Sequence, residues 1–198
     1  GAYLQALVCR YEAEGDPAAL ERARRGYHAL RHVYDLGRQL EEGFFPKIYG
    51  GRFTQQTSTD QVLYAVQALD RFGAVASEAE RREIARMIGF MIGFWVKRRY
   101  RFGYYHIPDM EWPLARFPSL LLLAHRHTGE APFRAEYERL LAEGVNRHPG
   151  ESRLRRKRSG EVQPSDFERE QQAWVLFSTA DAVTMDIMEL EYLLRHPE

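Results

Sequence analysis

Three glycines divide most of the chain into segments of nearly equal length. Gly15, Gly73 and Gly129 are 58 and 56 residues apart, and each follows an apolar stretch and precedes one rich in Glu and Arg. Glycine commonly ends a helix in the left-handed conformation, and Glu and Arg four residues apart support a second, solvated helix. Self-similarity at a fixed period is typical of stacked repeats. The spacing therefore predicts a stack of helical hairpins.

The two helices of each predicted hairpin differ in character. Residues 62–69 (VLYAVQAL) and 119–125 (SLLLLAH) are apolar on most sides, which predicts inner helices over about 59–72 and 113–128. The stretches ALERARRGYHALRHV and FRAEYERLLAEG are amphipathic, which predicts outer helices.

The connections alternate between short and long. Turns inside a hairpin are short, whereas the returns between hairpins are long, at about 41–57, 99–112 and 146–167. All three long returns are therefore predicted at one end of the stack, over the starts of the inner helices. Long loops on a rigid scaffold are where binding and catalytic residues usually lie.

Composition excludes several classes of protein. Lys and Arg total 28, as do Asp and Glu, so the formal net charge is zero and no global field favours nucleic acid or an anionic membrane. Cys9 is the single cysteine, which excludes an intramolecular disulfide and a cysteine zinc cluster. The apolar run 84–96 contains Arg86 and is shorter than the roughly 20 residues that a membrane span needs, so it predicts a buried helix.

The hairpin period, the inner and outer alternation and the loop placement resemble the six-hairpin (α/α) toroid. The motifs TSTDQ at 57–61 and LLLLAHRHTGEAPFRAEYERLL at 120–141 look like what such proteins carry. Many glycoside hydrolases, several polysaccharide lyases and some sugar epimerases share this toroid. The resemblance covers about residues 1–148, and the region near residue 186 departs from the pattern because no turn glycine occurs there.

The resemblance implies a single all-α domain over residues 1–198 that forms part of an (α/α) toroid. The chain holds about three and a half hairpins, whereas a closed ring needs six. Missing sequence or a partner would complete the ring, or the array is open. Because an unfinished ring exposes apolar flanks, we expect self-association or packing on another chain.

The first long loop and the TSTDQ motif have two interpretations. Ser58 and Gln61 fit a capping box, with Asp60 in the first turn of the helix. This accounts for the motif as a plain helix start. The aromatic residues of the loop either stack on sugar rings or plug the rim against the core: they are Phe44, Phe45, Tyr49 and Phe53. Asp60, Tyr64 and Gln67 share one helix face, which could point into a central cavity.

The second long loop concentrates groups that can act in catalysis. His106, Asp109, Glu111 and Trp112 lie within seven residues, beside Tyr104 and Tyr105. Glycoside hydrolysis needs two carboxyl groups that flank the bond, and Asp60 with Glu111 or Asp109 could supply them. Uronate elimination or sugar epimerisation instead needs a base near a carbon acid, for which the notable candidates are His106 and the two tyrosines. The structural alternative is that the acids serve helix entry before Pro113 and Trp112 packs on the rim.

The third long loop carries the basic run RLRRKR at 153–158. Such a run is usually solvated, and its functional alternative is attraction of an anionic glycan. His125 and His127 near an inner-helix end are expected to complement the helix dipole. No phosphate loop, HExxH motif or GxSxG elbow occurs, so no metal or cofactor is expected.

The sequence thus favours a glycoside hydrolase-like protein that acts on an oligosaccharide or a sugar acid. The alternatives are a non-catalytic helical scaffold, or a polysaccharide lyase or sugar epimerase on the same fold. The predicted catalytic residues are Asp60, Glu111, Asp109 and His106. The predicted substrate-binding residues are Tyr49, Phe53, Gln61, Tyr64, Tyr105 and Trp112.

Overall fold

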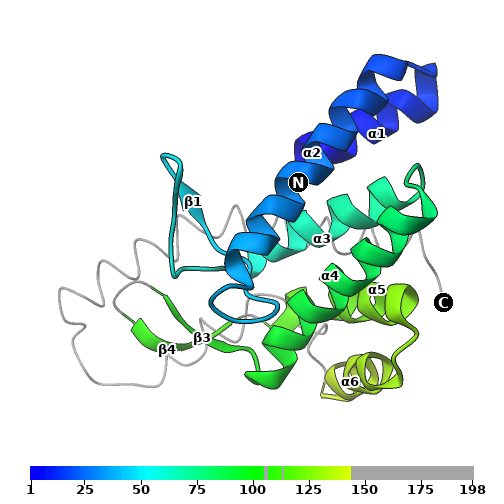
Figure 1. Cartoon of the computed structure of the whole chain (residues 1–198). Helices are drawn as coiled ribbons and strands as arrows, with labels where there is room; N and C mark the ends of the chain where they lie inside the picture. Colours follow the sequence, from blue (N-terminus) through cyan, green and yellow to red (C-terminus); the bar gives the residue numbers. More distant parts are fainter. Residues whose placement is uncertain (105–106, 113, 144–198) are drawn as a thin grey trace, which may run out of the picture.

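The protein is mostly helical, as the sequence predicts. The structure, a computed structural model, describes residues 1–104, 107–112 and 114–143. Its helices are α1 (Ala2–Glu14), α2 (Pro17–Gly37), α3 (Thr59–Gly73), α4 (Glu78–Lys97), α5 (Pro118–Thr128) and α6 (Ala131–Ala142), with a 3₁₀ helix η1 (Leu114–Arg116). Consecutive helices pair into three hairpins joined by short turns (Figure 1).

Two small antiparallel sheets interrupt the helices, which the sequence analysis did not predict. One pairs β1 (Ile48–Tyr49) with β2 (Arg52–Phe53), and the other pairs β3 (Arg101–Tyr104) with β4 (Ile107–Glu111). Each sheet lies within one of the first two long returns between hairpins. In Figure 1 both sheets lie on the same side of the helices.

The turn glycines behave as predicted at two of the three positions. Gly15 and Gly129 end α1 and α5 in the left-handed conformation, with φ of 67° and 73°. The prediction for Gly73 was wrong, because α3 includes this glycine and Ala74 follows it in a right-handed conformation. The link to α4 begins with a hydrogen bond from Val75 N to Phe72 O, so the chain turns without a left-handed residue.

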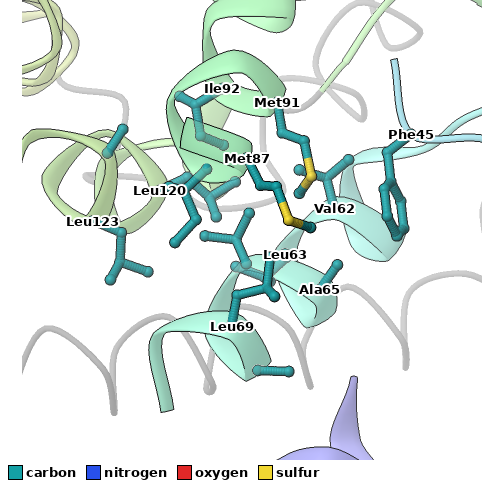
Figure 2. Close-up of a cluster of buried hydrophobic side chains, with 14 of the residues drawn as sticks. Phe45, Val62, Leu63, Ala65, Leu69, Met87, Met91, Ile92, Leu120 and Leu123 are labelled. Carbon is teal, nitrogen blue, oxygen red and sulfur yellow. The ribbon is translucent and has the colours of Figure 1, made fainter. Parts of the chain in front are cut away.

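The core lies where α3, α4 and α5 meet. Every residue of α5 from Pro118 to Ala124 is buried, and buried positions surround most of α3. Most of the apolar residues at 84–96 of α4 are buried, as predicted, with Met87 and Met91 fully buried, whereas Phe90 is 44% exposed. Figure 2 shows both methionines pointing from α4 toward side chains of α3 such as Val62 and Leu63. The inner helix predicted over about 113–128 begins later than expected, because α5 starts at Pro118, after η1.

Successive hairpins contact one another through polar pairs that are 56 to 59 residues apart. Tyr27 Oη donates to Glu83 Oε2 at 2.7 Å, from α2 to α4. The other pairs are Glu12 with Arg71, Glu41 with Arg98, Thr59 with Arg116, and Asp70 with His127. These separations match the spacing of the turn glycines, so similar positions of neighbouring hairpins lie side by side.

No helix in the described part of the chain combines the length and the apolar character that crossing a membrane requires.

Candidate functional site

The first long loop is built as a β-hairpin on a buried base. Gly50 and Gly51 form its tip with φ of 54° and 76°, and Tyr49 pairs with Arg52 across it. Two positive φ values in a two-residue connection are what a type I′ turn needs, and glycine adopts them without strain. Below the tip, Thr54 Oγ1 donates to Lys47 O at 3.0 Å. The Gly-Gly pair in the sequence was the signal for this hairpin.

The aromatic side chains of this loop divide into two groups. Phe44 and Phe45 are each only 3% exposed and belong to the core, where Phe44 packs 5.7 Å from the Phe94 ring. Tyr49 and Phe53 on the hairpin are 50% and 40% exposed. Phe44 and Phe45 at the base of the loop therefore plug the core, whereas Tyr49 and Phe53 form exposed aromatic surface, for which stacking on sugar rings stays a prediction.

The start of α3 is held differently from the predicted capping box. Ser58 is the N-cap residue, but its side chain makes no capping hydrogen bond. Gln61 Nε2 instead donates to Pro46 O at 3.0 Å, which ties the first loop to the helix. The prediction was wrong because this carbonyl, fifteen residues earlier, takes the Gln61 side chain. A true capping box occurs at α4, between Ser77 and Glu80.

A cavity of about 640 Å³ lies between the first loop, the start of α3, and parts of α1 and α2. Its polar wall includes Asp60, Gln61 and Tyr64 from α3 and Lys47 and Tyr49 from the loop. Leu30 and Val33 of α2 and Phe45 supply apolar wall. Four of the predicted site residues thus share one cavity: Tyr49, Asp60, Gln61 and Tyr64.

Three side chains on this wall have unfilled hydrogen-bonding capacity. The Asp60 carboxylate makes no hydrogen bond or ion pair with any described residue, and it is partly buried. Ser58 Oγ and Gln61 Oε1 are buried atoms without a hydrogen-bond partner. Leaving such groups unpaired is costly, and the partly buried Asp60 carboxylate is the one of the three that a ligand in the cavity could reach.

The remaining candidate of the shared helix face, Gln67, lies elsewhere. It is 6% exposed, and its Nε2 is buried without a partner. Gln67 is not among the residues that line the cavity, since it lies two turns further along α3, inside the packed core.

Asp109 in the second loop lies in an exposed ion pair. Its Oδ2 accepts from Arg101 Nη2 at 2.7 Å across the β3–β4 hairpin, and the Arg101 Nε also donates to the carboxylate. The hydrogen bond from Arg101 holds the pKa of Asp109 below its usual range. Asp109 does not line the cavity that contains Asp60.

Trp112 packs into the core rather than lining the cavity. It is 5% exposed, and its ring meets Trp95 at 5.6 Å in an edge-on arrangement. Its Nε1 donates to Phe102 O at 3.3 Å. Tyr100, at the start of the same loop, is also buried and donates from Oη to Glu136 Oε1 at 2.6 Å. The second loop therefore closes one end of the core.

Several predicted residues lie outside the described ones. These are Tyr105, His106 and the third loop at 146–167 with its basic run, and the side chains of Tyr104 and Glu111. The backbone of Glu111 pairs with Arg101 in the sheet. The proposed pairing of Asp60 with Glu111 or His106 thus stays a prediction.

The described residues contain no group of three or more His, Cys, Asp or Glu side chains suited to hold a metal ion. The two histidines near the end of α5 make local or interhelical contacts. His127 Nε2 lies 2.8 Å from Asp70 Oδ1 on α3, and His125 Nδ1 lies 3.1 Å from Glu130 O.

Comparison of the chain with protein-family models, with curated proteins and with solved structures found no match. The cavity and its side chains are therefore the basis for a functional proposal.

Proposed function

We propose that the cavity at the first loop binds a saccharide. The observation that carries this proposal is the combination of one partly buried carboxylate, Asp60, with the tyrosines Tyr49 and Tyr64 on a single wall. A sugar ring has apolar faces that pack on aromatic rings and a rim of hydroxyl groups that donate to carboxylate and amide oxygens. Ligand sites commonly join an apolar wall to a few placed polar groups in this way.

The size of the cavity is compatible with such a ligand. Small-molecule sites occupy about 300–1,000 Å³, and this cavity has about 640 Å³. Tyr49 is half exposed at its edge, on a hairpin that projects beyond the helices. Because Gln61 ties the base of the loop to α3, the hairpin is held in place before any ligand binds.

The proposed fold context is part of an (α/α) toroid. The polar contacts between residues 56 to 59 apart support it, because stacked hairpins of one period bring similar positions together. The burial of α3 and α5 compared with α6 also supports the inner and outer alternation. Self-association through apolar flanks belongs to the same proposal and is tested by sedimentation at increasing protein concentration.

The proposed reaction is hydrolysis of a glycosidic bond, with Asp60 as one of the two carboxyl groups. The second must lie about 5–9.5 Å away, the exact separation depending on stereochemistry. Glu111 is our candidate for this role, since Arg101 holds the Asp109 carboxylate outside the cavity. Fold alone does not imply this reaction, so it depends on a test.

Asp60→Asn tests the proposal, with Asp109→Asn as the matched control. Asparagine keeps the size of the side chain and suits a helix start, so the thermal unfolding midpoint should stay near that of the wild type. Turnover of neutral oligosaccharides, measured as new reducing ends, should fall about 10²–10⁴-fold for Asp60→Asn, as expected for loss of general acid or base catalysis. Asp109→Asn should retain the wild-type rate. Unchanged turnover in Asp60→Asn would exclude Asp60 from the chemistry.

A binding protein without catalysis is the second candidate. It is favoured by the fact that, of the described residues, Asp60 is the one carboxylate that lines the cavity. In this case calorimetry would detect saccharide binding with no turnover, and Asp60→Asn would weaken binding alone.

A further inference from the structure

The two strands of the hairpin in the first loop differ in their relation to the cavity. Both residues of β1, Ile48 and Tyr49, line the cavity, whereas Arg52 and Phe53 of β2 do not. As seen from the cavity, β2 therefore lies beyond β1, about 4.8 Å further out, which is the usual spacing of paired strands. The surface that β2 presents is next to the cavity but outside it.

An apolar pair connects the cavity wall with that outer surface. Ile48 and Phe53 lie directly opposite each other across the hairpin, and opposite residues of an antiparallel pair present their side chains on the same face. They are 38% and 40% exposed. The apolar wall to which Ile48 contributes thus continues over the hairpin onto the Phe53 ring. Exposed apolar surface that is continuous with a cavity is a feature of ligand-binding grooves.

The stem of the hairpin is braced, so the position of Phe53 is set before any ligand binds. Lys47 N donates to Gln56 O at 2.7 Å. Lys47 O accepts from Thr54 N at 3.1 Å and from Thr54 Oγ1 at 3.0 Å. Thr54 follows Phe53 directly in the chain. A ring that is already ordered costs less conformational entropy when a ligand packs on it.

We infer that the bound saccharide is longer than the cavity, and that its chain continues over β1 onto Phe53, which forms a second, outer subsite. This inference rests on the proposed saccharide-binding function. It narrows the substrate class to oligosaccharides and polysaccharide chains rather than single sugars. Because neither side chain of the Ile48–Phe53 pair is charged, the inference applies to neutral and acidic chains alike.

Phe53→Ala tests the outer subsite, with Phe90→Ala as the matched control. Phe90 is the same type of residue and is 44% exposed, but it lies on α4 and does not line the cavity. The probes are neutral hexose and uronic acid oligosaccharides, each in a series from monosaccharide to hexasaccharide, titrated by calorimetry.

For the wild type we expect the affinity to rise with chain length beyond the shortest ligand that binds. Phe53→Ala should weaken binding of the longest ligands about 2–10-fold, as for the loss of one aromatic contact, and should leave the shortest ligand unaffected. Phe53→Tyr keeps the ring and should retain the wild-type affinities, as should Phe90→Ala.

Three results would count against these expectations. Affinity that does not rise with chain length, or equal weakening of short and long ligands in Phe53→Ala, would overturn the inference and leave the saccharide site standing. Loss of self-association in Phe53→Ala, measured by sedimentation, with unchanged length dependence would also overturn it, because the pair would then contact a second copy of the chain. Absence of binding at every length in both series would overturn the proposed function itself.

Discussion

The first and second long loops are both rich in aromatic residues but have different roles in the molecule. Both also contain a two-stranded hairpin. The first loop presents Tyr49 half exposed at the edge of a cavity, whereas the second buries Trp112 and Tyr100. Equivalent connections between neighbouring hairpins can thus line an open cavity in one place and cover the core in another.

The difference follows from what lies beneath each loop. The second loop folds over Phe94 and Trp95 at the apolar end of α4, and aromatic rings gain most from contact with other rings in a dry core. The first loop uses Phe44 in the same cluster, 5.7 Å from Phe102, and so its base is also part of the core. Its hairpin continues past the cluster, where Tyr49 is half exposed.

The largest effect is expected for Trp112→Ala in the second loop. Removing this buried ring should lower the free energy of unfolding by about 3–5 kcal/mol, as for other large aromatic truncations. Tyr49→Ala in the first loop is the matched variant and should change it by less than about 0.5 kcal/mol, because the ring is half exposed. Denaturant unfolding measures both. Equal losses would show that the two loops contribute alike to stability.

A smaller difference in stability is expected within the first loop, between a substitution at its base and one at its tip. Gly43 has φ of 84°, and a Cβ there would lie 2.0 Å from Phe90 O of α4. Gly43→Ala should cost about 2–5 kcal/mol, combining about 1–2 for the left-handed backbone with about 1–3 for overpacking. A Cβ at Gly50 would meet no atom within 4 Å, so Gly50→Ala should lower the free energy of unfolding by only about 1–2 kcal/mol, the cost of the left-handed backbone. Similar losses of unfolding free energy at Gly43 and Gly50 would contradict the view that the base of the loop is closely packed and its tip is not.

The sequence predicted the helices better than the connections. Apolar periodicity predicted the end of α3 to within one residue. The start of α5 was predicted at Pro113 but lies at Pro118, and either proline would suit the first turn of a helix. Local pattern could not show that Pro46 O would take the Gln61 side chain, because this contact depends on how the loop folds back.

The sequence predicted some residues of the candidate cavity and not others, because it predicts which helix a loop precedes but not how the loop folds. Placing a loop over the start of an inner helix was enough to bring Asp60 and Tyr49 to one cavity. Asp109 was predicted as a catalytic carboxylate on the same grounds. It instead pairs with Arg101 across a hairpin that the sequence analysis did not predict.

Alkaline pH should weaken the fold through the buried tyrosines, including Tyr100 in the second loop. Burial, together with a hydrogen bond to a glutamate, raises the pKa of Tyr27, Tyr34 and Tyr100 above the ordinary value of 10.0. A raised pKa gives stability that is complete below pH 10 and is lost as the pH rises above it. The free energy of unfolding should therefore fall above pH 10, and less steeply in Tyr100→Phe. A pH profile that is the same for the wild type and Tyr100→Phe would contradict this, and Tyr49→Phe in the first loop is the control.

The smallest effect is expected for Asp109→Asn. Its ion pair with Arg101 is exposed, and such pairs contribute little to stability. The unfolding midpoint and the saccharide affinity should both match those of the wild type. A clear loss of affinity would place Asp109 in the binding site and would end the contrast between the two loops.

Backbone amide NMR during titration with a neutral oligosaccharide tests the central claim most directly, since it observes both loops in one sample. The account predicts shifts for residues 45–53 and for the first turn of α3 at 58–61, with residues 100–104 and 107–112 unchanged. Shifts confined to the second loop, or spread equally over both, would contradict a binding site built on the first loop.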